Sequence, residues 1–197
     1  MTGKEILFEV CLGNEGDVGV VTLNRPQFLN ALSLNMLEQM LSKMSDWSSN
    51  DSIKAVIIKS SSEGVFCAGG DIRSLYQSRN KDSKNHPFFH CEYALNRQLY
   101  HFPKPIVAFC DGVTMGGGVG LSIHGSHRVA TLALKWAMPE TKIGFFPDVG
   151  VSYHLSRCKD FIGHYIALSG RTLDAPSALD LGLVDAVVMQ EDLAKLE

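Results

Sequence analysis

The chain has 197 residues, which is enough for one domain with a substantial hydrophobic core. Hydrophobic residues make up 45% of it and charged residues 20%, a balance typical of a soluble globular domain. The net charge of −3 and the absence of a basic face argue against a nucleic-acid partner. No apolar run reaches the length of a membrane-spanning helix, so a membrane partner is not expected either.

The N-terminal sequence and the cysteines bear on the compartment. The first 26 residues lack the apolar run of a signal peptide and the Arg/Ser-rich bias of a transit peptide. The five cysteines are odd in number, widely spaced and mostly inside apolar segments. They predict core thiols in a reducing compartment. The sequence leaves the mitochondrial, peroxisomal and cytoplasmic compartments open.

The first third of the chain predicts two strands and a helix. The strands are "ILFEV" and "GVVTLN", and "GNEGDVG" forms the turn between them. A helix is expected from Ser33, its N-cap, to Trp47, with an apolar stripe at helical spacing. The stripe consists of Leu37, Met40, Leu41 and Met44. Apolar runs at 54–60 and 105–111 predict two buried strands.

The remaining elements continue the alternation of strands and helices. The polar stretch 77–87 predicts a surface loop, and a helix is expected from Phe88 to Phe102. Residues 128–134 predict another strand, 148–182 predict short helices ending at a glycine, and "VDAVV" predicts a last strand. Strands with continuous apolar cores, separated by helices, favour an α/β fold with helix-covered sheets.

Two glycine-rich turns are the first candidates for a site. "VTMGGGVGLSIHG" follows one predicted strand and opens a helix, and "SSEGVFCAGGDI" follows another. Glycine turns at helix N-termini leave backbone N–H groups free, and such groups bind anions or a developing oxyanion. Two turns that donate to one oxygen would form an oxyanion hole. The alternative is that the glycines only permit tight turns or close packing. Neither turn matches a phosphate loop or a dinucleotide fingerprint.

Three longer stretches carry a resemblance to a known family. "FCAGGDIRSLY", "KPIVAFCDGVTMGGGVGLSIHG" and "AMPETKIGFFPDVGVSYHLSR" resemble the crotonase (enoyl-CoA hydratase/isomerase) superfamily, most closely its 3-hydroxyisobutyryl-CoA hydrolase family. The resemblance covers nearly the whole chain. It implies a spiral of β-β-α units and a thioester carbonyl held by two backbone N–H groups. By motif position, these donors are expected at Ala68 and Gly117.

Carboxylates are the candidate catalytic side chains. Glu140 and Asp148 each follow a proline, and the apolar run "IGFF" lies between them. A partly desolvated carboxylate has a raised pKa, which suits a general base, whereas helix N-terminal acids are the alternative. The resemblance identifies this pair with the acidic pair of the hydrolase family. It also identifies Glu92, in "FFHCEYALN", with an acidic substrate contact, although a solvated helix face is equally compatible with Glu92. The substrate-binding set implied is therefore Glu92, Gly117, Glu140 and Asp148.

The residue at position 120 bears on the reaction type. In enoyl-CoA hydratases the corresponding stretch resembles "GGGCE", and its glutamate is one of the two that they use in catalysis. This chain reads "GGGVG", so Gly120 occupies the position of that glutamate. The resemblance therefore favours hydrolysis of 3-hydroxyisobutyryl-CoA to 3-hydroxyisobutyrate and CoA, a step of valine degradation. Glu140 would act as general base or as nucleophile. An enoyl-CoA hydratase or isomerase, or a non-catalytic acyl-CoA-binding remnant, are the alternatives.

The remaining expectations concern partners and extent. No cofactor is expected because CoA is part of the substrate, and no metal is expected because the histidine pairs 86/90 and 124/127 lack companions at ligand spacing. Arg25, Arg73 and Lys104 are candidate contacts for CoA phosphates, with surface charge as the alternative. Residues 1–197 are expected to form one crotonase-like domain that lacks the usual C-terminal helical extension, with self-association as an expected consequence.

Overall fold

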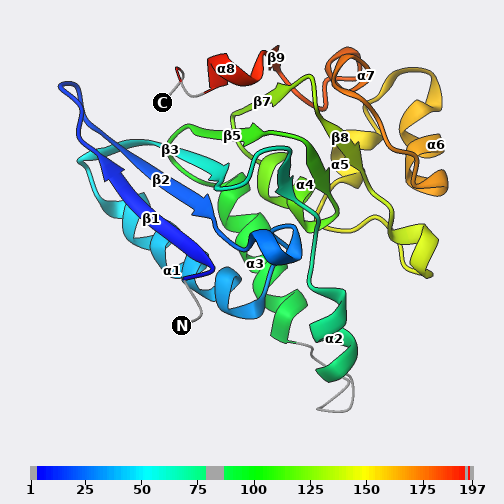
Figure 1. The fold of residues 1–197 in the computed structure, drawn as a ribbon, viewed down its shortest axis with the longest axis horizontal. Coiled ribbons are helices and arrows are strands. Elements are labelled where there is room, and N and C mark those ends of the chain that lie inside the picture. Colours follow the sequence, from blue (N-terminus) through cyan, green and yellow to red (C-terminus); the bar gives the residue numbers. More distant parts are fainter. Residues whose placement is uncertain (1–3, 79–86, 194, 196–197) are drawn as a thin grey trace.

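Two sheets form the frame of the protein (Figure 1). The computed structural model describes residues 4–78, 87–193 and 195. A six-stranded sheet has the order β1-β2-β3-β5-β7-β9, and a three-stranded sheet has the order β4-β6-β8. The strands are β1 Ile6–Cys11, β2 Asp17–Leu23, β3 Ile53–Ser60, β4 Val65–Cys67, β5 Ile106–Cys110, β6 Val113–Met115, β7 His127–Thr131, β8 Lys135–Ala137 and β9 Ala186–Val188. The hairpin β1–β2 is antiparallel, and the other neighbouring pairs are parallel.

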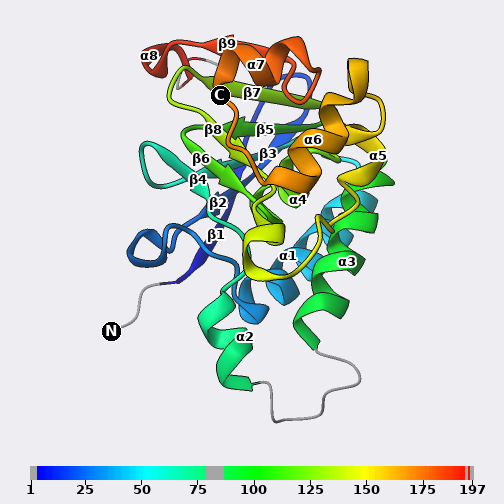
Figure 2. The same cartoon turned by 90° about the vertical axis from the view of Figure 1, so that its right-hand side faces the viewer.

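Helices pack against both sheets. They are α1 Leu34–Ser49, α2 Ile72–Ser78, α3 Pro87–Tyr100, α4 Gly117–Ser122, α5 Ser152–Leu155, α6 Ile162–Ser169, α7 Ala175–Asp180 and α8 Gln190–Leu193, with the 3-10 turns η1 Pro26–Phe28, η2 Glu140–Ile143 and η3 Lys159–Phe161. Figure 2 shows α1 and α3 side by side on the same side of the sheets. No helix in the described ranges is long and apolar enough to cross a membrane.

The chain repeats one unit of structure three times. A strand of the large sheet leads into a short strand of the small sheet and then into a helix or helical turn: β3-β4-α2, β5-β6-α4 and β7-β8-η2. Because successive units add parallel strands to both sheets, the chain winds as a spiral of β-β-α units. The predicted α/β class is confirmed, and so is the predicted spiral.

The helix α1 illustrates why the sequence folds in this way. Its N-cap is Ser33, whose hydroxyl accepts a hydrogen bond from the N–H of Met36 at 3.2 Å, as predicted. The apolar stripe faces the core, where Met36, Leu37, Met40, Met44 and Trp47 are buried. The helix continues to Ser49, two residues beyond the predicted end. Burial of this stripe against the sheet is what stabilises the helix.

The glycine-rich helix α4 lies between the two main clusters of the core. All six of its residues are buried. Leu121 belongs to the cluster under α1 and α3, whereas Val119 and Ile123 belong to the cluster formed with β8, α6 and α7. The start of α4 is therefore held from both sides. This placement fixes the position of Gly117.

The structure departs from the predicted elements in a few places. The strands β4, β6 and β8 were not predicted, because three residues are too few to show an alternating pattern. The predicted strand 128–134 ends at Thr131 and turns. Of the predicted loop 77–87, residues 77 and 78 end α2 and Pro87 begins α3, and the rest lies outside the described residues. Short helices do occupy 148–182, and Gly182 follows them with φ +68°.

Candidate active site

A cavity of about 470 Å³ lies at the carboxyl ends of all three strands of the small sheet. It is bounded by the turns after β4, β6 and β8 and by side chains of α2 and α3. Loops at the carboxyl ends of parallel strands are the usual place for ligand binding in such folds. The cavity is lined by all five residues expected from the sequence at the oxyanion hole and the acidic cluster: Ala68, Glu92, Gly117, Glu140 and Asp148.

The two glycine turns meet in this cavity. Gly117 is the first residue of α4, and its N–H has no partner among the described residues. Gly70 lies opposite, and its N–H is likewise without a partner in the described part of the chain. A Cβ built on Gly117 would lie 3.4 Å from the nitrogen of Gly70, so the two amides are neighbours. Two free N–H groups this close form a candidate oxyanion hole.

The expected donor at Ala68 needs a correction. The N–H of Ala68 donates to the carbonyl of Leu29 at 3.0 Å and is not free. Leu32 then pairs with the next residues: its N–H donates to the carbonyl of Gly69 at 2.8 Å, and its carbonyl accepts from Asp71 at 3.0 Å. This pairing engages the amides of residues 68 and 71 and leaves those of Gly69 and Gly70 free among the described residues. The nitrogen of Gly70 adjoins Gly117. The turn lines the cavity as expected, but the free N–H beside Gly117 is two residues further along, at Gly70.

Three carboxylates from separate elements line the cavity. Glu92, on α3, is 4% exposed, and burial, with the nearby charges of Asp148 and Glu140, raises its pKa to about 8. Glu140, on η2, is 9% exposed, and burial raises its pKa to about 7. Its Oε2 has no hydrogen-bond partner among the described residues. Burial also raises the pKa of Asp148, although the Tyr93 hydroxyl opposes this by donating to Asp148 Oδ2 at 2.7 Å. The cluster is therefore able to hold and release protons near neutral pH.

The glycines give these carboxylates room. A Cβ at Gly116 would lie 2.8 Å from Glu140 Oε1, and the backbone there has φ +51°. A Cβ at Gly117 would collide with Glu92 Oε1. Two of the three consecutive glycines thus lie directly against an acidic side chain. Both the close approach and the positive φ require glycine at position 116.

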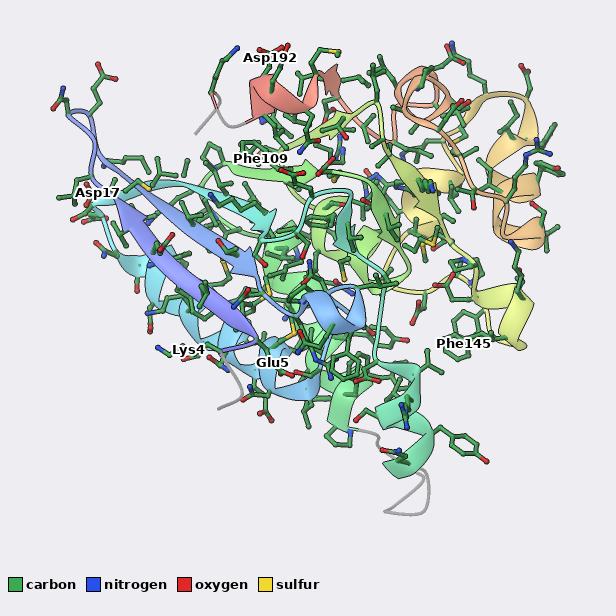
Figure 3. All side chains as sticks on the ribbon, viewed as in Figure 1. Lys4, Glu5, Asp17, Phe109, Phe145 and Asp192 are labelled. Carbon is green, nitrogen blue, oxygen red and sulfur yellow. The ribbon has the colours of Figure 1, made fainter. Side chains whose placement is uncertain are left out.

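A buried arginine fixes the first glycine turn. Arg25 forms ion pairs with Asp71 at 2.9 Å and with Glu5 at 2.8 Å, and it also donates to the carbonyl of Ala31 at 2.9 Å. Glu5 lies just before β1 (Figure 3). Asp71 ends the turn that carries Gly70, so Arg25 ties that turn to the N-terminal hairpin. A buried ion pair of this kind orients its partners, and Arg25 is not available for a phosphate.

The other candidate phosphate contacts differ from one another. Lys104 donates to the carbonyls of Trp47 and Asn50 at the end of α1, so it caps that helix. Arg73, on α2, is exposed. Cys67 is fully buried, and burial raises its pKa to about 12, which makes it a packing thiol. Among the described residues, no three His, Cys, Asp or Glu side chains are arranged so that they could hold a metal ion, and His86 lies outside those residues.

Gly120 faces a filled space rather than the cavity. A Cβ at this position would lie 2.8 Å from Val149 Cβ and 3.0 Å from Asn96 Oδ1, and both residues are buried. The space that a longer side chain would need is therefore occupied.

Gly120→Ala is expected to lower the free energy of unfolding by about 1–3 kcal/mol, because the added methyl overpacks the core against Val149. Urea denaturation followed by circular dichroism measures this loss. A variant as stable as the parent would show that the core at this position yields without strain.

The backbone beside Asp148 is held in an unusual conformation. Val149 has φ +46°, which is rare for a β-branched residue. Its carbonyl accepts a hydrogen bond of 2.7 Å from His124 Nε2, just beyond the end of α4. Burial lowers the pKa of His124, so the ring is neutral and carries its proton on the nitrogen that faces the carbonyl. The sequence did not reveal the roles of Arg25, His124 and Tyr93, because each acts through a contact with a residue far away in the chain.

Comparison with known proteins gives one consistent group of relatives. The family model "Enoyl-CoA hydratase/isomerase" matches residues 18–197. The chain is 46% identical over 190 residues to the 3-hydroxyisobutyryl-CoA hydrolase, mitochondrial, of Homo sapiens, covering 96% of this chain and 49% of the relative. The Danio rerio protein of the same name is 43% identical over 196 residues, covering 99% and 50%. The chain thus spans about half the length of the curated relatives it matches.

Solved structures share the fold. A carnitinyl-CoA dehydratase from Mycobacterium thermoresistibile superposes with a TM-score of 0.92 at 38% identity, covering 98% of this chain and 56% of that one. An enoyl-CoA hydratase from Rhodobacter sphaeroides gives 0.90 at 34% identity, covering 98% and 57%. The spiral of β-β-α units is therefore a known fold.

Proposed function

Because the chain belongs to the enoyl-CoA hydratase/isomerase family, we propose that it hydrolyses a short-chain 3-hydroxyacyl-CoA thioester, converting 3-hydroxyisobutyryl-CoA and water to 3-hydroxyisobutyrate and CoA. Relatives that bear the name of this hydrolase are 43–46% identical over most of the chain. One observation supports the proposal above all: two free backbone N–H groups and three carboxylates line the same cavity.

The free amides provide the place for the thioester carbonyl. The oxygen would accept hydrogen bonds from the N–H groups of Gly70 and Gly117, which adjoin each other at the ends of β4 and β6. Attack on the carbonyl carbon moves charge onto this oxygen. Preorganised donors then stabilise the transition state, and each is worth about 2.7–4 kcal/mol in well-studied enzymes. The N-terminal end of α4 adds its positive dipole at the same point.

Glu140 is the proposed base or nucleophile. Its raised pKa of about 7 matches the requirement of a general base, and its unpartnered Oε2 is free to take a proton from water. Alternatively, the carboxylate attacks the carbonyl itself, expels CoA thiolate and forms a mixed anhydride that water then cleaves. A single turnover in oxygen-18 water separates the two routes, because label in the Glu140 carboxylate arises only from the anhydride.

Glu92 and Asp148 are proposed to recognise the 3-hydroxyl group of the acyl chain or to position water. With a pKa of about 8, Glu92 is mostly protonated at neutral pH and donates a hydrogen bond, whereas an ionised Asp148 accepts one. A hydroxyl group both donates and accepts. The pair therefore complements a 3-hydroxyacyl chain better than a plain alkyl chain.

The apolar wall of the cavity suits a short acyl chain. Phe89 on α3 stacks on Phe145 in the loop after η2, with ring centroids 5.9 Å apart. Phe145 lies beside η2 in Figure 3. The wall excludes water from one side of the reacting carbonyl, and this strengthens the hydrogen bonds at the oxygen.

Hydration or isomerisation of an enoyl-CoA is the alternative activity, and the solved structures named as hydratases support keeping it. Position 120 argues against hydration, because it holds a glycine where hydratases have a glutamate. The space around Gly120 is also filled. A protein that binds acyl-CoA without turnover is the third possibility. No cofactor or metal enters the proposal, because the thioester brings its own CoA.

Compartment and assembly remain proposals as well. The curated relatives are named as mitochondrial proteins, which favours the mitochondrial option among the three that the sequence left open. Self-association is proposed from the exposed apolar side chains of α6, including Tyr165 and Leu168.

Thiol release from a panel of acyl-CoA esters tests the proposed reaction. The protein is incubated separately with 3-hydroxyisobutyryl-CoA, isobutyryl-CoA and crotonyl-CoA. Free thiol is followed with a thiol dye, and crotonyl-CoA is also followed through the absorbance of its enoyl thioester. We expect thiol release that is fastest from the 3-hydroxy ester. Loss of the enoyl-thioester absorbance without release of thiol would indicate a hydratase. No reaction with any of the three esters would indicate a binding protein.

A further inference from the structure

Tyr93 contacts the site although the sequence assigned it no role. It follows Glu92 on α3, and its hydroxyl donates to Asp148 Oδ2 at 2.7 Å. The two residues are 55 positions apart in the chain, so the contact joins α3 to the loop after η2. Tyr93 is 40% exposed. Its hydroxyl could therefore bond to solvent, so the contact with Asp148 is not needed to satisfy a buried polar group.

The Asp148 carboxylate has few other anchors. The backbone after Asp148 is fixed by the hydrogen bond from His124 Nε2 to the Val149 carbonyl. In the part of the chain that the structure describes, no lysine or arginine forms an ion pair with Asp148. Among the described residues, Tyr93 is the one side-chain donor to this carboxylate. The hydroxyl thus determines how the carboxylate is oriented.

Like charges surround this contact. Glu92 from α3 and Glu140 from η2 both face the cavity with Asp148, and Lys142 of η2 also lines it but forms no ion pair among the described residues. Three carboxylates in one partly desolvated cavity do not all ionise at neutral pH, because each charge opposes the next. A hydrogen-bond donor to one of them favours the charged form of that carboxylate.

We propose that Tyr93 is a positioning residue: its hydroxyl keeps Asp148 ionised and directs the Asp148 carboxylate into the cavity. The tyrosine hydroxyl donates to the charged form of Asp148 and so stabilises it. Glu92, one residue earlier on the same helix, then holds its proton beside this charge. The catalytic consequence rests on the proposed hydrolysis, whereas the charge state of Asp148 does not.

Titration of Asp148 in the Tyr93→Phe variant tests the charge state directly. The full chain is labelled with carbon-13 at the aspartate carboxyl groups, and the Asp148 signal is assigned by its loss in Asp148→Asn. Removing the donor is expected to raise the Asp148 pKa above that of the parent. Tyr100→Phe is the matched control, because it removes a hydroxyl group from the same helix. This hydroxyl has no hydrogen-bond partner among the described residues. Its Asp148 titration is expected to match the parent.

The kinetic readout is the pH profile of thioester hydrolysis. If Asp148 must be ionised, Tyr93→Phe moves the acid limb of kcat/KM to higher pH and lowers kcat roughly ten- to hundredfold at neutral pH. A merely structural tyrosine would lower activity equally at every pH. An unchanged Asp148 titration in Tyr93→Phe overturns the proposal whatever the activity. If the parent itself releases no thiol, the proposed function fails, and the titration alone still decides the role of Tyr93.

Discussion

Glu140→Gln is expected to reduce the hydrolysis of 3-hydroxyisobutyryl-CoA by about 10²–10⁴-fold, which is the usual contribution of a general base. Glutamine has almost the same shape but neither accepts a proton nor attacks a carbonyl. Both proposed routes need the Glu140 carboxylate, so both are blocked. The fold should survive, because Glu140 Oε2 has no hydrogen-bond partner to lose among the described residues. Thiol release under saturating substrate measures the loss.

Glu38→Gln provides the matched control for this experiment. Glu38 is exposed on α1, away from the cavity, and its substitution should leave thiol release unchanged. Circular dichroism and thermal unfolding of both variants establish that they fold alike. Turnover of Glu140→Gln within a few fold of the parent would rule out Glu140 both as base and as nucleophile.

Glu92→Gln is expected to stabilise the fold while it impairs hydrolysis. The folded pKa of Glu92 is about 8, against about 4.5 unfolded, so the folded chain binds a proton that the unfolded chain releases. Its favourable contribution is therefore complete below pH 4.5 and is lost as the pH rises through 8. Glutamine never ionises. Since one pKa unit corresponds to about 1.4 kcal/mol, the expected gain at pH 8 is on the order of 2–4 kcal/mol.

Urea unfolding of parent and variant at pH 4.5 and pH 8 measures this effect. The gain should be near zero at pH 4.5 and large at pH 8. An equal gain at both pH values would mean that improved packing, not a buried charge, stabilises the variant. A loss of activity is expected alongside, because stabilising substitutions at a strained active site commonly cost function.

Much of the frame was predictable because it follows local rules. The N-cap at Ser33 and the stripe on α1 are visible in the sequence, and so are the buried strands of the large sheet. The strands of the small sheet were missed because each has three residues. Their existence depends on pairing between segments far apart in the chain, which local patterns do not record.

The site was predictable where a motif marks it. Glu140, Asp148 and Glu92 were named from sequence, and the structure brings them into one cavity. The expectation of a free N–H at Ala68 was wrong, because a motif locates a turn but not the direction of each amide. That direction depends on how residues 68–71 pair with Leu29 and Leu32.

The supporting roles of Arg25 and His124 could not be predicted from the sequence, for a related reason. Arg25 and His124 act through contacts with Asp71 and the Val149 carbonyl, which lie 46 and 25 positions away. A buried arginine and a surface arginine look alike in a sequence. Only the folded chain shows that these side chains hold the two sides of the cavity in place.

The infrared stretch of a thioester carbonyl bound to the Glu140→Gln variant is the most direct measurement. A substrate labelled with carbon-13 at the carbonyl is bound to this slow variant, and its band is compared with that of the free ester. If the N–H groups of Gly70 and Gly117 donate hydrogen bonds to the thioester oxygen, the carbonyl band shifts to lower frequency. An unshifted band for a bound substrate would contradict the account.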